Sequence, residues 1–191
     1  MVLGGNMTKP IEIIKNDNKR VEIFYDEYLD SPRDWDNLGI MICFHQKYNL
    51  GDKHSYDSTD YNGWDDIEKA ITRDENAAVI LPLYLYDHSG ITIKTTPFSC
   101  RWDSGQIGFI YTSKKNVRKE FEVKHITTKI REKVKEILLG EVKTYDQYLN
   151  GDVYYYDYYV DDNLVDGCGG YFGIDYIMEE ARNILEIKKA A

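Results

Sequence analysis

The residues from Leu81 to Tyr111 read LPLYLYDHSGITIKTTPFSCRWDSGQIGFIY, and this stretch decides the fold class. Its two apolar runs, residues 81–86 and 107–111, have the length and composition of strands. The segment between them carries Asp87, His88, Cys100 and Asp103, residue types that can perform acid–base or nucleophilic chemistry. The stretch therefore predicts two paired strands with a candidate site where they end.

Strand-like and helix-like segments follow one another in mixed order on both sides of this stretch. Strands are expected at residues 11–14, 21–25, 40–45, 77–86, 153–160 and 164–165, with 40–45 central because both of its faces are apolar. A turn at residues 16–18 joins the first two, the tyrosines of residues 154–159 should face core and solvent alternately, and the glycines of residues 167–173 suggest a bulge or a close backbone approach. Helices are expected at 64–72, at 114–121 with Ser113 as cap, after Thr127 or Thr128 up to Gly140 with a further turn to residue 149, and after a capping Asp175. The pattern predicts an α+β fold with a largely antiparallel sheet and several flanking helices.

The length of 191 residues suits one buried core, so we expect a single domain over residues 7–191. Because a second methionine, Met7, follows the first six residues, we interpret residues 1–6 as a disordered leader or a cloning scar. No apolar run is long enough for a membrane span and no signal peptide is recognisable. The three cysteines are odd in number and far apart, so free thiols in the cytoplasm are expected.

The net charge of −9 disfavours direct nucleic-acid binding, which needs clustered basic residues. From Asp146 to Glu180 the chain has no Lys or Arg but many Asp, Glu and Tyr residues, whereas residues 114–143 are rich in Lys and Arg. One interpretation is two solvated faces that partly neutralise each other. The other is an acidic, tyrosine-rich surface that imitates nucleic acid towards a basic protein, or that associates with a second copy in a homodimer.

Four blocks carry a resemblance to a known family. They are residues 31–39 (SPRDWDNLG), 48–52 (YNLGD), 81–90 (LPLYLYDHSG) and 100–106 (CRWDSGQ). Together they resemble a family of short bacteriophage and mobile-element proteins that has no assigned activity. The resemblance implies an accessory gene, and such genes often encode inhibitors of host defence, including CRISPR–Cas and restriction systems.

A thiol site is one candidate for chemistry. Cys100 would be the nucleophile, His88 its base and Asp103 or Asp87 the orienting carboxylate, while Arg101 could also favour the thiolate. The alternative is that Cys100 is a small buried residue and His88 a loop histidine bonded to the backbone. No known catalytic signature surrounds either residue.

Metal sites are weaker candidates. Cys43 and His45 lie two residues apart on a strand, with His54 and Asp52 nearby, but the second close ligand pair typical of zinc sites is missing. A magnesium site would need convergence of Asp26, Asp34, Asp36 and Asp52, which their spacing does not show. We therefore predict neither a metal nor another cofactor.

The remaining candidates are contact residues, since aromatic and Arg side chains often anchor protein interfaces. They are Arg33, Trp35, Asp36, Arg101, Trp102, Tyr156, Asp157, Tyr158, Asp161 and Asp162. Our leading hypothesis is an accessory protein of a phage or mobile element that binds and inhibits a host protein, such as a nucleic-acid-binding defence nuclease, without contacting nucleic acid or membrane. The alternatives are a small Cys/His-dependent or metal-assisted hydrolase and a virion assembly protein.

Overall fold

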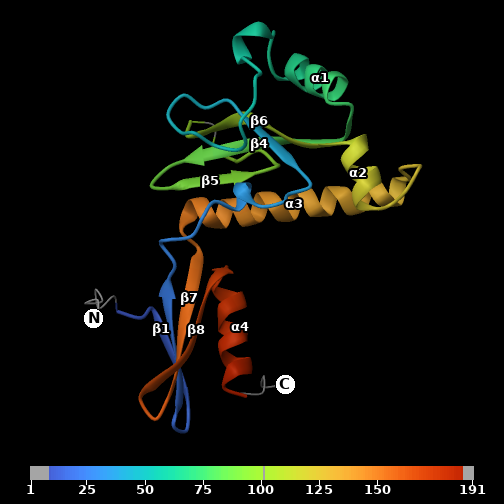
Figure 1. Ribbon diagram of the computed structural model, residues 1–191. Helices are drawn as coiled ribbons and strands as arrows, with labels where there is room; N and C mark the ends of the chain where they lie inside the picture. The colour runs from blue at the N-terminus through green and yellow to red at the C-terminus, as the bar shows by residue number, and fades with distance from the viewer. Residues whose placement is uncertain (1–8, 101, 187–191) are drawn as a thin grey trace. The chain divides into compact units, whose positions relative to one another are not determined.

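The computed structural model describes residues 9–100 and 102–186 (Figure 1). Within these residues the chain forms eight strands and four α-helices, and the strands make two antiparallel sheets. In chain order the elements are β1 (Glu12–Asn16), β2 (Lys19–Tyr25), β3 (Ile40–Cys43), α1 (Trp64–Asp74), β4 (Ala77–Asp87), β5 (Ile91–Lys94), β6 (Ser104–Ser113), α2 (Lys114–Glu120), α3 (Thr128–Asn150), β7 (Val153–Val160), β8 (Asn163–Phe172) and α4 (Ile174–Ile184). The predicted α+β class is confirmed, with two sheets in place of the single sheet expected.

The chain divides into two compact units. Unit 1 comprises residues 1–30 and 147–191, and unit 2 comprises residues 31–146. Each sheet belongs to one unit: β1, β2, β7 and β8 lie in unit 1, and β3, β4, β5 and β6 lie in unit 2. The single domain over residues 7–191 stays a prediction, and the leader expected at residues 1–6 lies outside the described residues.

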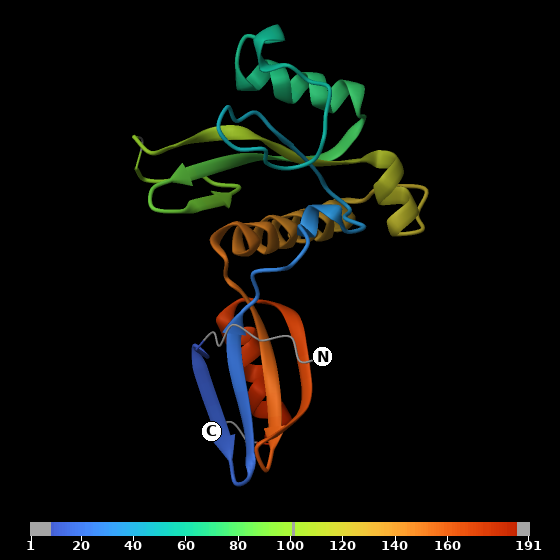
Figure 2. The ribbon, with the colours of Figure 1, turned by 60° about the vertical axis from the view of Figure 1, so that its left-hand side comes forward.

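Unit 1 is a four-stranded sheet in the order β1-β2-β7-β8, with α4 against one face (Figure 2). Alternate residues of β2 and β7 point towards α4, as the period of a strand requires. Their buried side chains pack with those of α4 into one apolar cluster: Val21, Ile23, Tyr154, Tyr156, Ile177, Ala181 and Leu185. The predicted alternation of the tyrosines along β7 is thereby confirmed, since Tyr155 lies on the other face and stacks on Phe24 with 4.9 Å between ring centroids.

The glycines of β8 have a structural cause. The pairing of β8 with β7 shifts register between Tyr171 and Cys168, so the strand bulges there. Beside the bulge the Gly170 amide donates to Asp26 Oδ2 at 3.0 Å, and a β-carbon on Gly169 would lie only 2.6 Å from the same oxygen. The bulge and the close approach predicted from the sequence are both confirmed.

Unit 2 is a sheet in the order β3-β6-β4-β5, and α1 and α3 lie on its opposite sides (Figure 1). The runs 81–86 and 107–111 pair as expected, with Leu81 opposite Ile110 and Leu83 opposite Gly108. On the α1 side, Phe109 and Tyr111 pack with other buried residues of the sheet and of α1: Ile42, Ile67, Ile71 and Ala77. On the α3 side the helix contributes a buried stripe at helical spacing: Val134, Leu138, Val142 and Tyr145.

Three expectations about single elements are wrong. β3 is an edge strand and not a central one. It is apolar because helices lie on both faces of the sheet. The 52–54 segment covers its free edge, where the Asp52 amide donates to Met41 O at 2.8 Å. Gly140 does not end α3, because the buried stripe continues past it and a helical glycine costs only about 1 kcal/mol. Asp175 does not cap α4: the N-cap residue is Gly173, which has no side chain to bond the helix, and Asp175 lies inside the first turn.

Candidate functional site

The loop of residues 31–39 is held by a buried ion-pair network in unit 2. The Arg33 side chain is only 5% exposed, and its guanidinium bonds both oxygens of Asp52, at 3.1 Å from Nε and 2.6 Å from Nη2. The same group reaches Glu141 Oε2 at 3.3 Å and donates to Gly39 O at 2.7 Å. Arg33 therefore joins two loops to α3 with a bidentate pair, the strongest form of such a contact.

The two carboxylates of this network also bind backbone amides. Glu141 Oε1 accepts from the amides of Leu38 at 2.9 Å and Gly39 at 3.1 Å, and Asp52 Oδ2 accepts from the Met41 amide at 2.7 Å. Every charge in the network thus has several partners, which is the condition for a buried ion pair to be tolerated. These partners could not be predicted from the sequence, because Arg33 lies 19 residues from Asp52 and 108 from Glu141.

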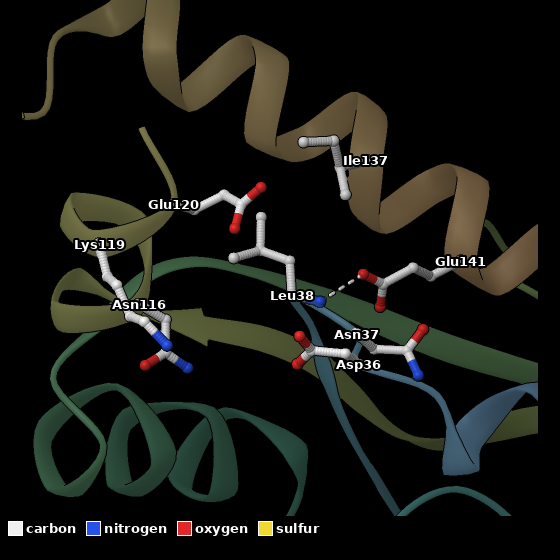
Figure 3. Close-up of a pocket in the computed structure, with 8 residues that line it drawn as sticks. All are labelled: Asp36, Asn37, Leu38, Asn116, Lys119, Glu120, Ile137 and Glu141. Atoms are coloured by element: carbon white, nitrogen blue, oxygen red, sulfur yellow. Dashed lines mark hydrogen bonds between the residues drawn. The ribbon is translucent and has the colours of Figure 1, made fainter. Parts of the chain in front are cut away.

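A pocket of about 320 Å³ opens beside this network, between the loop, α2 and α3 (Figure 3). Its walls combine the apolar side chains of Leu38 and Ile137 with the charged groups of Asp36, Lys119 and Glu120. Asp36, one of the predicted contact residues, therefore faces a cavity. The volume is at the lower end of the range for small-molecule sites, so it would hold one inserted side chain or a small polar molecule.

The predicted thiol site is partly assembled. Asp103 Oδ2 lies 3.5 Å from His88 Nδ1 and 3.7 Å from Cys100 Sγ, so the carboxylate contacts both other members. In a working triad the histidine bridges nucleophile and carboxylate, whereas here the carboxylate is the shared partner. The His88 side chain is 63% exposed. The three residues are brought together, with the carboxylate and not the histidine between the other two.

A second polar cluster surrounds Asp87 at the end of β4. Its carboxylate accepts from Tyr48 Oη at 3.3 Å and pairs with Lys47 Nζ at 3.2 Å, and these contacts lower the pKa of Asp87. His45 Nδ1 accepts hydrogen bonds from the backbone amides of Lys47 and Tyr48, and these bonds shape the loop that carries both side chains. Asp87 is therefore bound to the 45–48 loop, a pairing that no sequence pattern indicates.

The other predicted contact residues of unit 2 differ in exposure. Trp102 is 95% exposed and Trp35 is about half exposed, so both present aromatic surface. Arg33 is buried in its network and has little surface to offer a partner. Arg101 lies outside the described residues. In this unit the exposed contact candidates are thus the two tryptophans and Asp36.

The predicted contact residues of unit 1 lie on and around the β7–β8 hairpin. Asp161 and Asp162 form its turn, and the first part of β8 is exposed. We use the term hairpin surface for five of the exposed residues at this end: Asp161, Asp162, Leu164, Val165 and Asp166. It contains three carboxylates and two aliphatic side chains, Leu164 and Val165, which are 60% and 58% exposed.

The β7 candidates are less accessible than the hairpin surface. Tyr156 is 6% exposed and packs under α4, and Tyr158 packs against the same cluster, so neither side chain is free for a partner. Asp157 lies on the opposite face, directly across from Glu22, and burial together with the Glu22 charge raises its pKa. The strand thus supports the hairpin surface and contributes little contact area itself.

The metal candidates are not brought together. Across residues 9–100 and 102–186, no group of three or more His, Cys, Asp or Glu side chains is arranged to hold a metal ion. His54 Nε2 lies 3.0 Å from the carbonyl oxygen of Cys43, a contact that occupies this ring nitrogen. Burial, with a smaller contribution from Asp52, raises the pKa of the Cys43 thiol to about 12, so the thiol is protonated at neutral pH.

This environment predicts a difference in thiol reactivity. At pH 8 we expect Cys100 and Cys168 to react with a chromogenic disulfide reagent in the folded chain, because both have exposed surface. Cys43 is buried and protonated, so it should react only after denaturant is added. The amount of chromophore released with and without denaturant measures the number of reactive thiols in the unfolded and folded chain. The Cys43→Ala variant shows whether the thiol that reacts only in denaturant is Cys43. Fast reaction of all three thiols in the folded chain would contradict it.

No protein-family model matches the chain, and neither does any curated protein or solved structure. Among the helices of the described residues, none combines the length and apolar character that a membrane span requires.

Proposed function

We propose that the chain is an accessory protein of a bacteriophage or mobile element that acts in the host cytoplasm, where it binds and inhibits a host protein. The inferred partner is a nucleic-acid-binding defence enzyme, as in anti-CRISPR or antirestriction inhibition. The hairpin surface would occupy a basic site on that enzyme. Neither nucleic acid nor membrane is the ligand.

The observation that carries this proposal is the uneven distribution of charge. Unit 1 has 15 Asp and Glu residues against 7 Lys and Arg, whereas unit 2 has 18 against 17. Almost all of the net charge of −9 therefore belongs to unit 1, which also holds ten of the 17 tyrosines. Carboxylates around exposed aliphatic side chains complement a basic, nucleic-acid-binding site in charge and supply apolar contact area.

The experiment starts with affinity capture of partners from host lysate by the full chain, followed by calorimetry on the purified partner. We expect a nucleic-acid-binding protein that loses its nucleic acid when the chain binds. The triple variant Asp161→Asn, Asp162→Asn, Asp166→Asn keeps the size of each side chain and removes three charges. It should bind about tenfold more weakly, with a smaller dependence on salt.

The matched control removes three exposed charges from unit 2 by the changes Asp60→Asn, Glu68→Gln and Glu132→Gln. It has the same net charge as the test variant and should keep wild-type affinity. Equal losses in both variants would mean that only overall charge matters. Unchanged affinity in the test variant, or simultaneous binding of partner, chain and nucleic acid, would remove the hairpin surface from the proposal.

The second candidate is a small hydrolase that uses Cys100, His88 and Asp103. It is favoured by one observation, the shared contact of Asp103 with the other two residues. The double variant Cys100→Ala, His88→Ala separates the candidates in the same experiment. An inhibitor retains its partner and its biological effect in this variant, whereas the hydrolase loses the effect and has no stoichiometric partner.

A further inference from the structure

A second pocket of unit 2, distinct from the one beside Arg33, has the lining of a ligand site. It measures about 440 Å³ and lies over β3, next to the C-terminal end of α1. Its apolar side chains are Ile40 and Ile42, and its polar groups come from three other segments: Lys53, His54, Ser55, Tyr56, Glu75 and Tyr111. The volume falls within the range of small-molecule sites.

Glu75 is the polar centre of this pocket. Tyr56 Oη donates to Glu75 Oε1 at 3.2 Å, and burial with the nearby Glu75 raises the pKa of Tyr56 to about 12. Burial and the nearby charge of Glu75 also raise the pKa of Tyr111, which is 3% exposed. Both phenols thus remain protonated at neutral pH, and the Tyr56 hydroxyl holds the carboxylate in place.

The negative charge of Glu75 is not neutralised within the part of the chain that the structure describes. Arg73 is the nearest cation in sequence, and it pairs with Asp74 at 2.7 Å. Lys53 lines the pocket but is exposed and forms no ion pair with Glu75. Glu75 also follows the last turn of α1, where the partial negative charge of the helix end adds to its own. The pocket therefore attracts a cation.

The hydrogen-bonding groups narrow the kind of cation. Tyr56 uses its O–H group on Glu75, and the phenol oxygens of both Tyr56 and Tyr111 have lone pairs that can accept hydrogen bonds. Together with the Glu75 carboxylate, the phenol oxygens of Tyr56 and Tyr111 give the pocket three neighbouring groups that accept hydrogen bonds. A primary ammonium group has three N–H donors. The His54 Nδ1 atom is a further buried nitrogen without a hydrogen-bond partner among the described residues. Ile40 and Ile42 suit an alkyl chain attached to the ammonium group.

We propose that the Glu75 pocket binds a primary alkylammonium group, with Glu75, Tyr56 and Tyr111 around the nitrogen and Ile40 and Ile42 along the alkyl chain. This site lies in unit 2 and does not depend on the hairpin surface, so it goes beyond the proposed inhibition. The ammonium group could belong to a free amine or to a lysine side chain of a protein, and the two sources are separable by experiment.

The test is a methyl-NMR titration of the full chain, followed at Ile40 and Ile42. The probe is butylammonium chloride, and its comparators are butan-1-ol, which lacks the charge, and butyltrimethylammonium, which lacks N–H donors. We expect saturable shifts at millimolar butylammonium, the usual range for so small a ligand, and much weaker binding of both comparators. Nα-acetyl-lysine methylamide then distinguishes the source: binding shows that a protein lysine fits, and no binding restricts the site to free amines.

Glu75→Gln provides the matching variant, because its amide oxygen still accepts from Tyr56 while the charge is lost. It should bind butylammonium about tenfold more weakly, the effect of losing a charged hydrogen-bond partner. Glu68→Gln removes the same charge from an exposed position of α1 and should change nothing. Equal binding of butanol and butylammonium to the wild type, no saturable shift at either isoleucine, or full affinity in Glu75→Gln would overturn the proposal.

Discussion

Arg33→Ala is expected to destabilise unit 2 by about 3–5 kcal/mol, the cost of leaving buried carboxylates without their cation. The side chain is 5% exposed, and its removal strands Asp52 and Glu141, which are themselves 22% and 12% exposed. Urea unfolding followed by tryptophan fluorescence measures the change. The signal reports unit 2 alone, because Trp35, Trp64 and Trp102 all lie within residues 31–146.

Two further variants show whether the unpaired charges cause the loss. Arg33→Ala in an Asp52→Asn, Glu141→Gln background should cost much less than in the wild type, since no carboxylate is then left buried alone. Arg73→Ala breaks an exposed pair with Asp74 and should have little effect. If Arg33→Ala lost as little stability as Arg73→Ala, the network would not stabilise the fold, and Arg33 would again be a candidate for contact with a partner.

Gly108→Ala is expected to have a comparable effect, about 3 kcal/mol or more, with loss of the β3–β6 pairing. A β-carbon at this position would overlap the carbonyl oxygen of Ile42 and would lie 2.9 Å from its carbonyl carbon and 3.0 Å from Cys43 Cα. All three atoms are backbone, so no side-chain rotation can relieve the clash. Unfolding of unit 2 by urea, together with amide exchange of residues 40–43, measures the loss.

Gly105→Ala is the matched control, since it lies on the same strand and its β-carbon would meet nothing within 4 Å. We expect a small gain, about 0.5 kcal/mol, because alanine loses less backbone entropy than glycine on folding. A Gly108→Ala variant as stable as Gly105→Ala would mean that β3 is not held against β6 at the spacing described here.

The class of fold and most of its elements could be predicted because they depend on local sequence. The turn of residues 16–18, the apolar run before Asp87, and the caps Ser113 and Thr127 are all readable from neighbouring residues. The errors arose where distant contacts outweigh local preference. Gly140 stays helical because the apolar stripe on α3 is buried on both sides of it, which no local rule could show.

The candidate site was less predictable, because its contacts join residues far apart in sequence. Asp103 meets His88 and Cys100 within one short stretch, and the sequence grouped all three. Residue type favours Arg33 and Tyr156 as contact residues, yet both side chains are buried, since type alone does not determine exposure. The Glu75 pocket had no sequence signal, because its walls come from β3, the 53–56 segment, the end of α1 and β6.

The bulged, glycine-rich strand β8 also bears on how copies of this chain meet each other. As the outer strand of its sheet it would ordinarily offer a template on which another strand could be added. Here Asp166 Oδ1 already accepts a hydrogen bond from the Gly167 amide at 2.9 Å, and the register shifts bend the strand. The nearby carboxylates also repel the same edge of a second copy. These features disfavour edge-to-edge pairing of β8 with a second copy of the chain, so we expect the acidic end of the hairpin to remain accessible to a different molecule.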